Sequence, residues 1–310
     1  SSHHNPTPSA GGVAIIIALS VGVIAQMVSF PWLLRHFPFY WVGYSVAVLL
    51  VGLVSFWDDC HPLSYRLRLL MHILGSIFLV LSGLVIQFPA VDSLNQPWLA
   101  QLLTIFCLVS LINGANFLDG LNGLLAGSVL INLVVILFMT PLISTKGIFV
   151  GLLIASILGF FVFNFPNAKI FMGDVGSTFL GLTLGFLALL SQDNSLSASE
   201  TAWVHKSFVL TLMPMAFLWF DVGFTLLRRS LLARRLTEAH RDHLFHVLHD
   251  AGYSHAFVSS TYFFSVIVMG ILSLGCYYSY ISFMHLMILY TVLQIAFCRW
   301  VFKQSHAMAR

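Results

Sequence analysis

Two adjacent aspartates are the first feature of the chain that could carry out chemistry. Asp58 and Asp59 close a long apolar stretch, within the run Phe-Trp-Asp-Asp-Cys-His. Neighbouring carboxylates repel each other unless a cation or a proton relieves them. Mg²⁺ prefers oxygen ligands, often one or two carboxylates together with substrate phosphates. The pair therefore indicates a site for a metal ion or a phosphate, and the alternative is a polar helix end exposed to water.

A second motif repeats polar side chains every three residues. Its members are Asn113, Asn116, Asp119 and Asn122, and a glycine follows each of the last two. On a helix this spacing predicts one polar stripe. Such a stripe is costly against lipid, so we expect it to face protein or an aqueous cleft. The alternative is a buried network of amides that binds no ligand.

The third motif joins a glycine turn to the start of an apolar span. The run Gly-Asp-Val-Gly-Ser at 173–177 stands directly before this span, and Asn164 precedes it. Free N–H groups at a helix N-terminus suit a phosphate, and Asp174 suits the metal ion that accompanies a phosphate. A capped helix start, with Ser177 or Asp174 as the cap, explains the same residues without a ligand.

Histidines recur every three residues in a later polar segment. They are His240, His243, His246 and His249. A histidine row can bind zinc, although the distant third ligand that usually completes such a site is not evident. Because Arg241 stands among them, recognition of a diphosphate is the better interpretation. One or two of the histidines can instead be solvated loop residues.

Asp221 lies inside an apolar stretch and is a functional candidate for that reason. A structural ion pair with Arg228 or Arg229, about two turns further on, explains it equally well. Near the start of the chain, the Pro and Gly residues within 6–12 predict a shaped loop, which is a weak signal alone.

The elements that must position these residues are membrane spans. Apolar residues make up 59% of the 310 residues and charged residues only 8%, against about 25% charged residues in soluble domains. Stretches of about 20 apolar residues recur from end to end, which predicts an all-α polytopic membrane protein with one domain, 1–310. The four cysteines have no paired spacing, which argues against a disulfide framework or a zinc site. We expect about ten transmembrane helices, near 12–34, 40–57, 69–88, 98–115, 123–141, 147–164, 176–191, 207–227, 259–279 and 282–302.

The Lys and Arg residues orient the predicted spans. If the loops alternate from the N-terminus, eleven of the 14 basic residues fall on the side of the N-terminus. An excess of Lys and Arg marks cytoplasmic loops, so we expect this side to face the cytoplasm, at the inner membrane of a bacterium. The carboxylates are expected to converge on the same side, because Asp58, Asp59, Asp119 and Asp174 all fall there.

Together and in this order, the motifs resemble those of the polyprenyl-phosphate N-acetylhexosamine-1-phosphate transferases, a membrane family of peptidoglycan and O-antigen synthesis. The family's paired aspartates match Asp58-Asp59, and its Asn-x-x-Asn-x-x-Asp-Gly-x-Asp-Gly-Leu run matches 113–124. Its Asn followed by Phe-Met-Gly-Asp-x-Gly-Ser matches Asn164 and 171–177. Its histidine-rich loop matches the region of His240 and His243, which looks most like the WbpL-type O-antigen branch. Asn122 departs from the pattern, because the family usually has a second Asp there.

The resemblance implies transfer of an N-acetylhexosamine 1-phosphate from a UDP-sugar to undecaprenyl phosphate at the cytoplasmic face, with release of UMP. It implies a need for Mg²⁺, for which Mn²⁺ can substitute, with Asp174 as the main ligand. The carboxylates assigned to catalysis are Asp58, Asp59 and Asp119. The residues assigned to substrate binding are Asn116, Asn122, Asn164, His240, Arg241 and His243. The expected partners also include membrane lipid and a second copy of the chain, and exclude nucleic acid. The family carries a helix before the N-terminal loop, so an additional N-terminal span is expected to be missing from this chain.

An ion-coupled membrane transporter is the alternative from another class, with Asp221 and the Asn/Asp stripe as the ion path. Transporters usually place binding residues near the bilayer midplane and often contain inverted repeats. Here no repeat is evident, and the acids lie at the ends of spans. A CDP-alcohol phosphotransferase is disfavoured, because its Asp-Gly-x-x-Ala-Arg core is absent at Asp119-Gly120.

Overall fold

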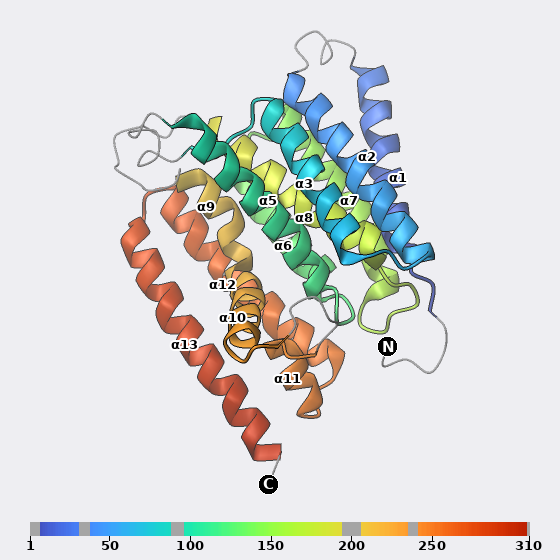
Figure 1. Cartoon of the computed structure of the whole chain (residues 1–310). Coiled ribbons are helices and arrows are strands. Elements are labelled where there is room, and N and C mark those ends of the chain that lie inside the picture. Colours follow the sequence, from blue (N-terminus) through green and yellow to red (C-terminus); the bar gives the residue numbers. More distant parts are fainter. Residues whose placement is uncertain (1–6, 31–37, 88–95, 194–205, 235–240, 309–310) are drawn as a thin grey trace.

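The computed structural model describes residues 7–30, 38–87, 96–193, 206–234 and 241–308. Within these ranges the chain is helical and contains no strand (Figure 1). The all-α polytopic fold is thereby confirmed. The helices are α1 Gly11–Ser29, α2 Phe39–Cys60, α3 Tyr65–Leu81, α5 Pro97–Leu118, α6 Leu124–Phe138, α7 Thr145–Asn164, α8 Gly173–Leu190, η2 Ser191–Asp193, α9 Lys206–Leu212, η3 Met213–Met215, α10 Ala216–Leu231, α11 Leu244–Asp250, α12 His255–Tyr277 and α13 Phe283–Met308.

Each of the ten predicted spans coincides with a helical segment. Among the described residues, eight segments are long and apolar enough to cross a membrane, while α6 is a shorter apolar helix. α3 is also short, with 17 residues. The span predicted at 207–227 is interrupted by η3, where Pro214 has no N–H to continue the helical ladder. The short helix α11 was not predicted from the sequence, because it lies within a polar, histidine-rich segment.

α8 is the central helix of the bundle. Every residue from Val175 to Leu190 is buried, and α1, α2, α5 and α9 pack around it. Glycines allow the close approach: a Cβ on Gly181 would lie 2.5 Å from the Leu111 carbonyl oxygen of α5, and one on Gly12 would lie 2.1 Å from the Gly176 nitrogen. Small residues at such contacts are typical of membrane helices. The packing of these four helices around α8 therefore fixes the position of its N-terminal end.

Local signals in the sequence set several helix starts. The hydroxyls of Ser64, Ser144 and Ser254 accept hydrogen bonds from the backbone N–H three residues later, at the starts of α3, α7 and α12. Pro97 opens α5, where its missing N–H costs nothing. These caps begin the helices that carry Arg68 and Asn116 toward the site.

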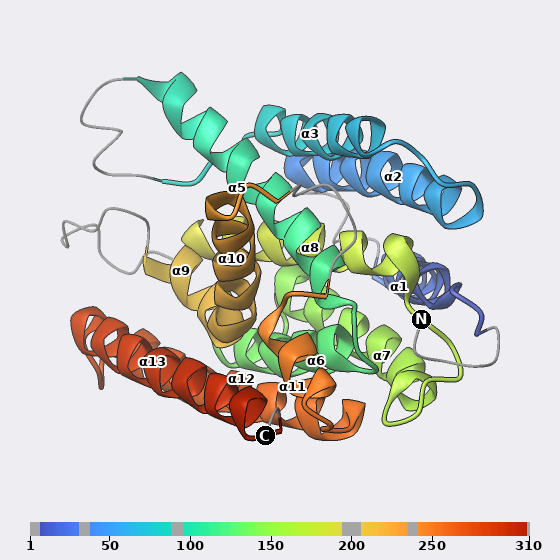
Figure 2. The ribbon, with the colours of Figure 1, turned by 60° about the horizontal axis from the view of Figure 1, so that its bottom comes forward.

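The segments with the polar motifs gather at one end of the bundle. The start of α1, the α2–α3 turn, the end of α5, the α7–α8 connection and α11 all lie at the lower end in Figure 1. Figure 2 brings this end forward and shows α11 over it, where α11 packs against α10, α12 and α13. The expected convergence of the motifs on one side of the membrane therefore agrees with the fold.

Candidate active site at one end of the bundle

The second and third motifs meet through an amide. Asn116 Nδ2 on α5 donates to Asp174 Oδ1 on α8 at 2.8 Å, and it lies 3.0 Å from Ser177 Oγ. The Asp174 side chain remains 30% exposed. The amide thus orients the Asp174 carboxylate and leaves it accessible from the end of the bundle.

Asp59 caps the N-terminus of α8 from a different helix. Its Oδ1 accepts from the Asp174 N–H at 3.0 Å, and its Oδ2 accepts from the Val175 N–H at 3.3 Å. A carboxylate is stabilised at the positive end of a helix. The expectation that these N–H groups are free for a phosphate is therefore wrong, and the cap is neither Ser177 nor Asp174.

Gly173 makes this close approach of the two helices possible. Its φ is +75°, a left-handed conformation that favours glycine. A Cβ at this position would also lie 2.5 Å from the Ser9 carbonyl oxygen and 2.7 Å from Asp59 Oδ2. The N-terminal loop packs here too, because the Phe171 N–H donates to the Pro8 carbonyl oxygen at 2.7 Å. The weak N-terminal signal therefore belongs to the same site.

Arg68 is a site residue that the sequence analysis did not single out. Its Nη1 lies 2.7 Å from Asp58 Oδ2 and 3.1 Å from Asp174 Oδ2, so one guanidinium bridges α2 and α8. Asp58 Oδ1 also accepts from the Leu63 N–H at 2.6 Å. A signal for Arg68 was available in the sequence, because four carboxylates need a nearby cation and Arg68 follows Asp58 and Asp59 by about ten residues.

Asp119 is the least compensated of the four carboxylates. It follows α5 directly as its C-cap, and its carboxylate makes no hydrogen bond or ion pair to any described residue. Burial raises the pKa of the Asp119 carboxyl well above its usual value, and the negative charges of Asp174 and Asp59 raise it further. The neighbouring negative charges favour binding of a cation or a proton at this carboxylate.

The donor set fits a hard divalent cation. Carboxylate oxygens of Asp119 and Asp174 are the ligand type that Mg²⁺ prefers, and Mg²⁺ takes its remaining ligands from water and phosphate. Within the described part of the chain, no three His, Cys, Asp or Glu side chains form a ready-made metal cluster.

Asn122 and Asn164 tie the surrounding loops together. Asn164 Oδ1 accepts from the Gly123 N–H at 2.8 Å, and its Nδ2 donates to the Ile170 carbonyl oxygen at 2.9 Å. Asn122 Nδ2 donates to the Pro166 carbonyl oxygen at 3.2 Å. The prediction of a single polar stripe is wrong beyond Asp119, because α5 ends at Leu118 and the chain turns before Asn122.

The residues of the histidine-rich segment differ in exposure and in contacts. His240 lies outside the described residues. Arg241 is exposed and its Nη2 lies 2.9 Å from Asp250 Oδ1. His243 is only 2% exposed, with its ring centroid 6.0 Å from that of Phe117. A Cβ on Gly120 would lie 3.1 Å from His246 Nε2, so His246 also reaches the second motif.

Asp221 anchors α11. It is fully buried, and its carboxylate accepts from the Leu244 N–H at 2.8 Å, the Phe245 N–H at 3.2 Å and the Tyr262 hydroxyl at 2.7 Å. The predicted pairing with Arg228 or Arg229 is wrong. Arg229 pairs instead with Asp242, because Asp221 already receives the helix N–H donors.

An apolar groove leads away from the site along the membrane. It lies between α5 and α10 and has a cavity volume of about 400 Å³. On α5 it is lined by Asn113, one turn before Asn116, and by Phe117, two residues before Asp119. On α10 it is lined by Trp219 and Leu226. The arrangement places a polar, acidic site at the end of a groove that suits a hydrocarbon chain.

Known proteins share this sequence pattern. Residues 41–192 match the model of glycosyl transferase family 4, a range that contains all four carboxylates and Arg68. The chain is 32% identical over 260 residues to a probable undecaprenyl-phosphate N-acetylglucosaminyl 1-phosphate transferase of Bacillus subtilis (strain 168), covering 82% of this chain and 68% of the relative.

Two further relatives have related activities in their names. A decaprenyl-phosphate N-acetylglucosaminephosphotransferase of Mycolicibacterium smegmatis is 31% identical, with 82% of this chain and 68% of the relative covered. A phospho-N-acetylmuramoyl-pentapeptide-transferase of Latilactobacillus sakei is 30% identical, with 69% and 66% covered. With its helical bundle and its acidic site in the matched range, the chain belongs to glycosyl transferase family 4.

Proposed function

We propose that the chain transfers an N-acetylhexosamine 1-phosphate from a UDP-sugar to undecaprenyl phosphate, and that it releases UMP. One observation carries this proposal: Asp59, Asp119 and Asp174 from three parts of the bundle meet at one membrane end, beside an apolar groove. Both substrates are polyanions and one is embedded in lipid, so their reaction needs this combination. The names of the relatives support a polyprenyl phosphate as the acceptor and an N-acetylglucosamine phosphate as the group transferred.

Phosphoryl transfer depends mainly on positioning and on neutralisation of charge. We assign Asp174 and Asp119 to Mg²⁺, or to Mn²⁺ in its place; when bound, the ion would neutralise phosphate oxygens. Asn116 orients the Asp174 carboxylate, and Asp59 fixes the start of α8. Arg68 holds Asp58 and Asp174 together and supplies a positive charge beside the phosphates.

Asp58 has a positioning role in this proposal rather than the role of a base. Its oxygens already accept from Arg68 and from the Leu63 N–H, so both are engaged in holding the α2–α3 turn and Arg68. The acceptor is a phosphate monoester, whose second pKa is near 6. It is therefore largely ionised at neutral pH and needs no strong base to become a nucleophile.

The polyprenyl chain would lie in the groove between α5 and α10, with its phosphate toward Asn116. The exposed Arg241 guanidinium would contact the sugar diphosphate, and we assign the same role to His240, which lies outside the described residues. The distribution of Lys and Arg supports a cytoplasmic site in a bacterial inner membrane. We further propose an O-antigen or similar lipid-linked glycan as the product's destination, and a homodimer as the assembly.

The experiment uses the purified chain in detergent with UDP-N-acetylglucosamine, undecaprenyl phosphate and Mg²⁺, and it measures UMP. Asp174→Asn should abolish UMP release and keep the wild-type unfolding midpoint within a few degrees. Asp193→Asn is the matched control, because it removes an aspartate from η2 beyond the opposite end of α8. Turnover of Asp174→Asn at the wild-type rate would refute the assigned role, and no UMP from the wild type would refute the proposed reaction.

A further inference from the structure

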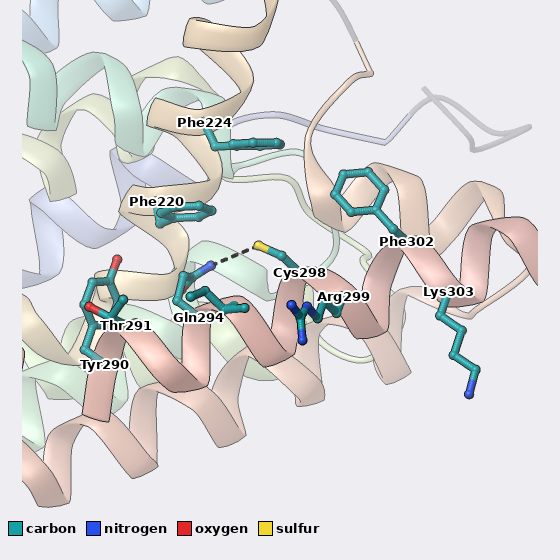
Figure 3. A pocket seen from close by; sticks show the side chains of 10 residues that line it. Phe220, Phe224, Tyr290, Thr291, Gln294, Cys298, Arg299, Phe302 and Lys303 are labelled. Atoms are coloured by element: carbon teal, nitrogen blue, oxygen red, sulfur yellow. Dashed lines mark hydrogen bonds between the residues drawn. The ribbon is translucent and has the colours of Figure 1, made fainter. Parts of the chain in front are cut away.

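A second groove opens between α10 and α13. It has a cavity volume of about 700 Å³. Phe220 and Phe224 project from α10 toward α13, where Phe302 lines the opposite wall (Figure 3). Only 17% of the apolar stretch of α13 is buried inside the bundle, the lowest share among the candidate membrane spans of the described residues. α13 is therefore open to the bilayer along the groove.

Two cations line this apolar groove. Arg299 and Lys303 are exposed and stand four residues apart on α13, a spacing that places them on one helix face. Neither forms an ion pair with any described carboxylate. Both belong to the part of α13 that extends toward the acidic end of the bundle (Figures 1 and 3). Basic side chains at a membrane interface attract the headgroups of anionic lipids.

α10 separates this groove from the one beside the acidic site. Its Trp219, Val222 and Leu226 side chains line the groove toward α5. Phe220 and Phe224 line the groove toward α13. No carboxylate and no asparagine lines the α10–α13 groove. A lipid in it would therefore have a phosphate near cations alone, and would lie on the opposite face of α10 from Asp119 and Asp174.

We propose that the α10–α13 groove binds one anionic phospholipid of the membrane. An acyl chain packs against Phe220, Phe224 and Phe302, and the phosphate of the headgroup contacts Arg299 and Lys303. The separation of the two grooves favours a phospholipid over the reacting polyprenyl phosphate as the occupant. Such a lipid fills the space that α13 leaves beside α10. The lipid thereby stabilises α10, whose Arg229 forms an ion pair with Asp242 just before α11.

Binding is measured by native mass spectrometry of the full chain in detergent, with phosphatidylglycerol as the probe. Phosphatidylcholine with the same acyl chains tests for headgroup charge, and inorganic phosphate tests for a free anion. We expect retention of one phosphatidylglycerol and no comparable retention of the other two. Each basic residue near a membrane contributes about 1 kcal/mol to the attraction of anionic lipid. The double variant Arg299→Gln/Lys303→Gln should therefore bind roughly 30-fold more weakly.

Matched variants separate a site from general attraction. Arg228→Gln removes an exposed arginine of α10 that does not line the groove, and it should retain the lipid. Ile295→Trp obstructs the groove and should weaken binding, whereas Val292→Trp changes an equally exposed residue of α13 outside it. Equal lipid retention in the double variant and the wild type would overturn the proposal. Displacement of phosphatidylglycerol by equimolar undecaprenyl phosphate, with the same dependence on Arg299, would also overturn it.

Discussion

Asp59 offers the sharpest test of the site, because the structure gives it a capping role that differs from direct catalysis. Asp59→Ala removes both acceptors of the Asp174 and Val175 N–H groups. Loss of an N-cap costs about 0.5–2 kcal/mol, and loss of a charge at a helix N-terminus adds about 0.3–1 kcal/mol. We expect Asp59→Ala to lower the free energy of unfolding by about 1–2 kcal/mol.

Asp59→Asn keeps one acceptor oxygen and loses the charge. It should therefore lower the free energy of unfolding by about half as much as Asp59→Ala. For a chain of this size, 1 kcal/mol corresponds to a shift of about 2–4 °C in the unfolding midpoint. Thermal unfolding in detergent, followed by intrinsic fluorescence, can resolve the expected order of wild type, Asn variant and Ala variant.

The control for this series is Cys60→Ser, at the next residue. Cys60 is an exposed free thiol at the last position of α2, so its substitution should leave the midpoint unchanged. Loss of UMP release in the Asp59 variants should follow the loss of stability, because the displaced start of α8 carries Asp174. If Asp59→Ala unfolds at the wild-type temperature but is inactive, the capping argument is refuted and Asp59 acts directly on a substrate.

Three further predictions follow from the same contacts. Asp119→Asn should raise the unfolding midpoint of the metal-free protein at pH 8: the folded-state pKa is raised above 3.8, so ionisation destabilises the fold as pH increases. The difference from wild type should vanish near pH 4 and shrink when Mg²⁺ is added, and a constant difference at all pH values would contradict this reasoning. Arg68→Gln should lower the metal-free midpoint by the equivalent of about 1 kcal/mol, with partial rescue by Arg68→Lys, measured by the same thermal unfolding. Excess EDTA should abolish UMP release and added Mg²⁺ or Mn²⁺ should restore it, whereas full activity in EDTA would exclude the proposed ion.

The sequence predicted the spans well because their signal is local. Each span is a continuous run of apolar residues, and the ten positions each hold helix. It was also predictable that the motifs meet on one side of the membrane, since successive spans place alternate loops on opposite sides. Gly181 and Gly185 allow close packing of α8 on α5, because added Cβ atoms would lie 2.5 Å and 2.6 Å from Leu111 and Leu108 atoms.

The pairings between helices were not predictable, because they depend on distances that spacing does not encode. Asp59 and Val175 are separated by 116 residues and Arg68 and Asp174 by 106. The sequence shows that these side chains share one membrane face, but not which of them touch. The histidine row shows the same limit. Its regular spacing does not indicate which histidine lies against the second motif, and only the fold places His246 against Gly120.

Asp221 decides between the two classes of function that the sequence left open. A carboxylate in an ion path must exchange its partners, and it usually faces a water-filled cavity. Here the carboxylate is fully buried, accepts from two N–H groups of α11 and from the Tyr262 hydroxyl, and lies 3.4 Å from Nδ1 of the buried His243. These donors belong to the fold and would have to break for an ion to bind. Asp221 therefore serves to hold α11 above the acidic site, which leaves the transporter hypothesis without its central residue and agrees with a transferase.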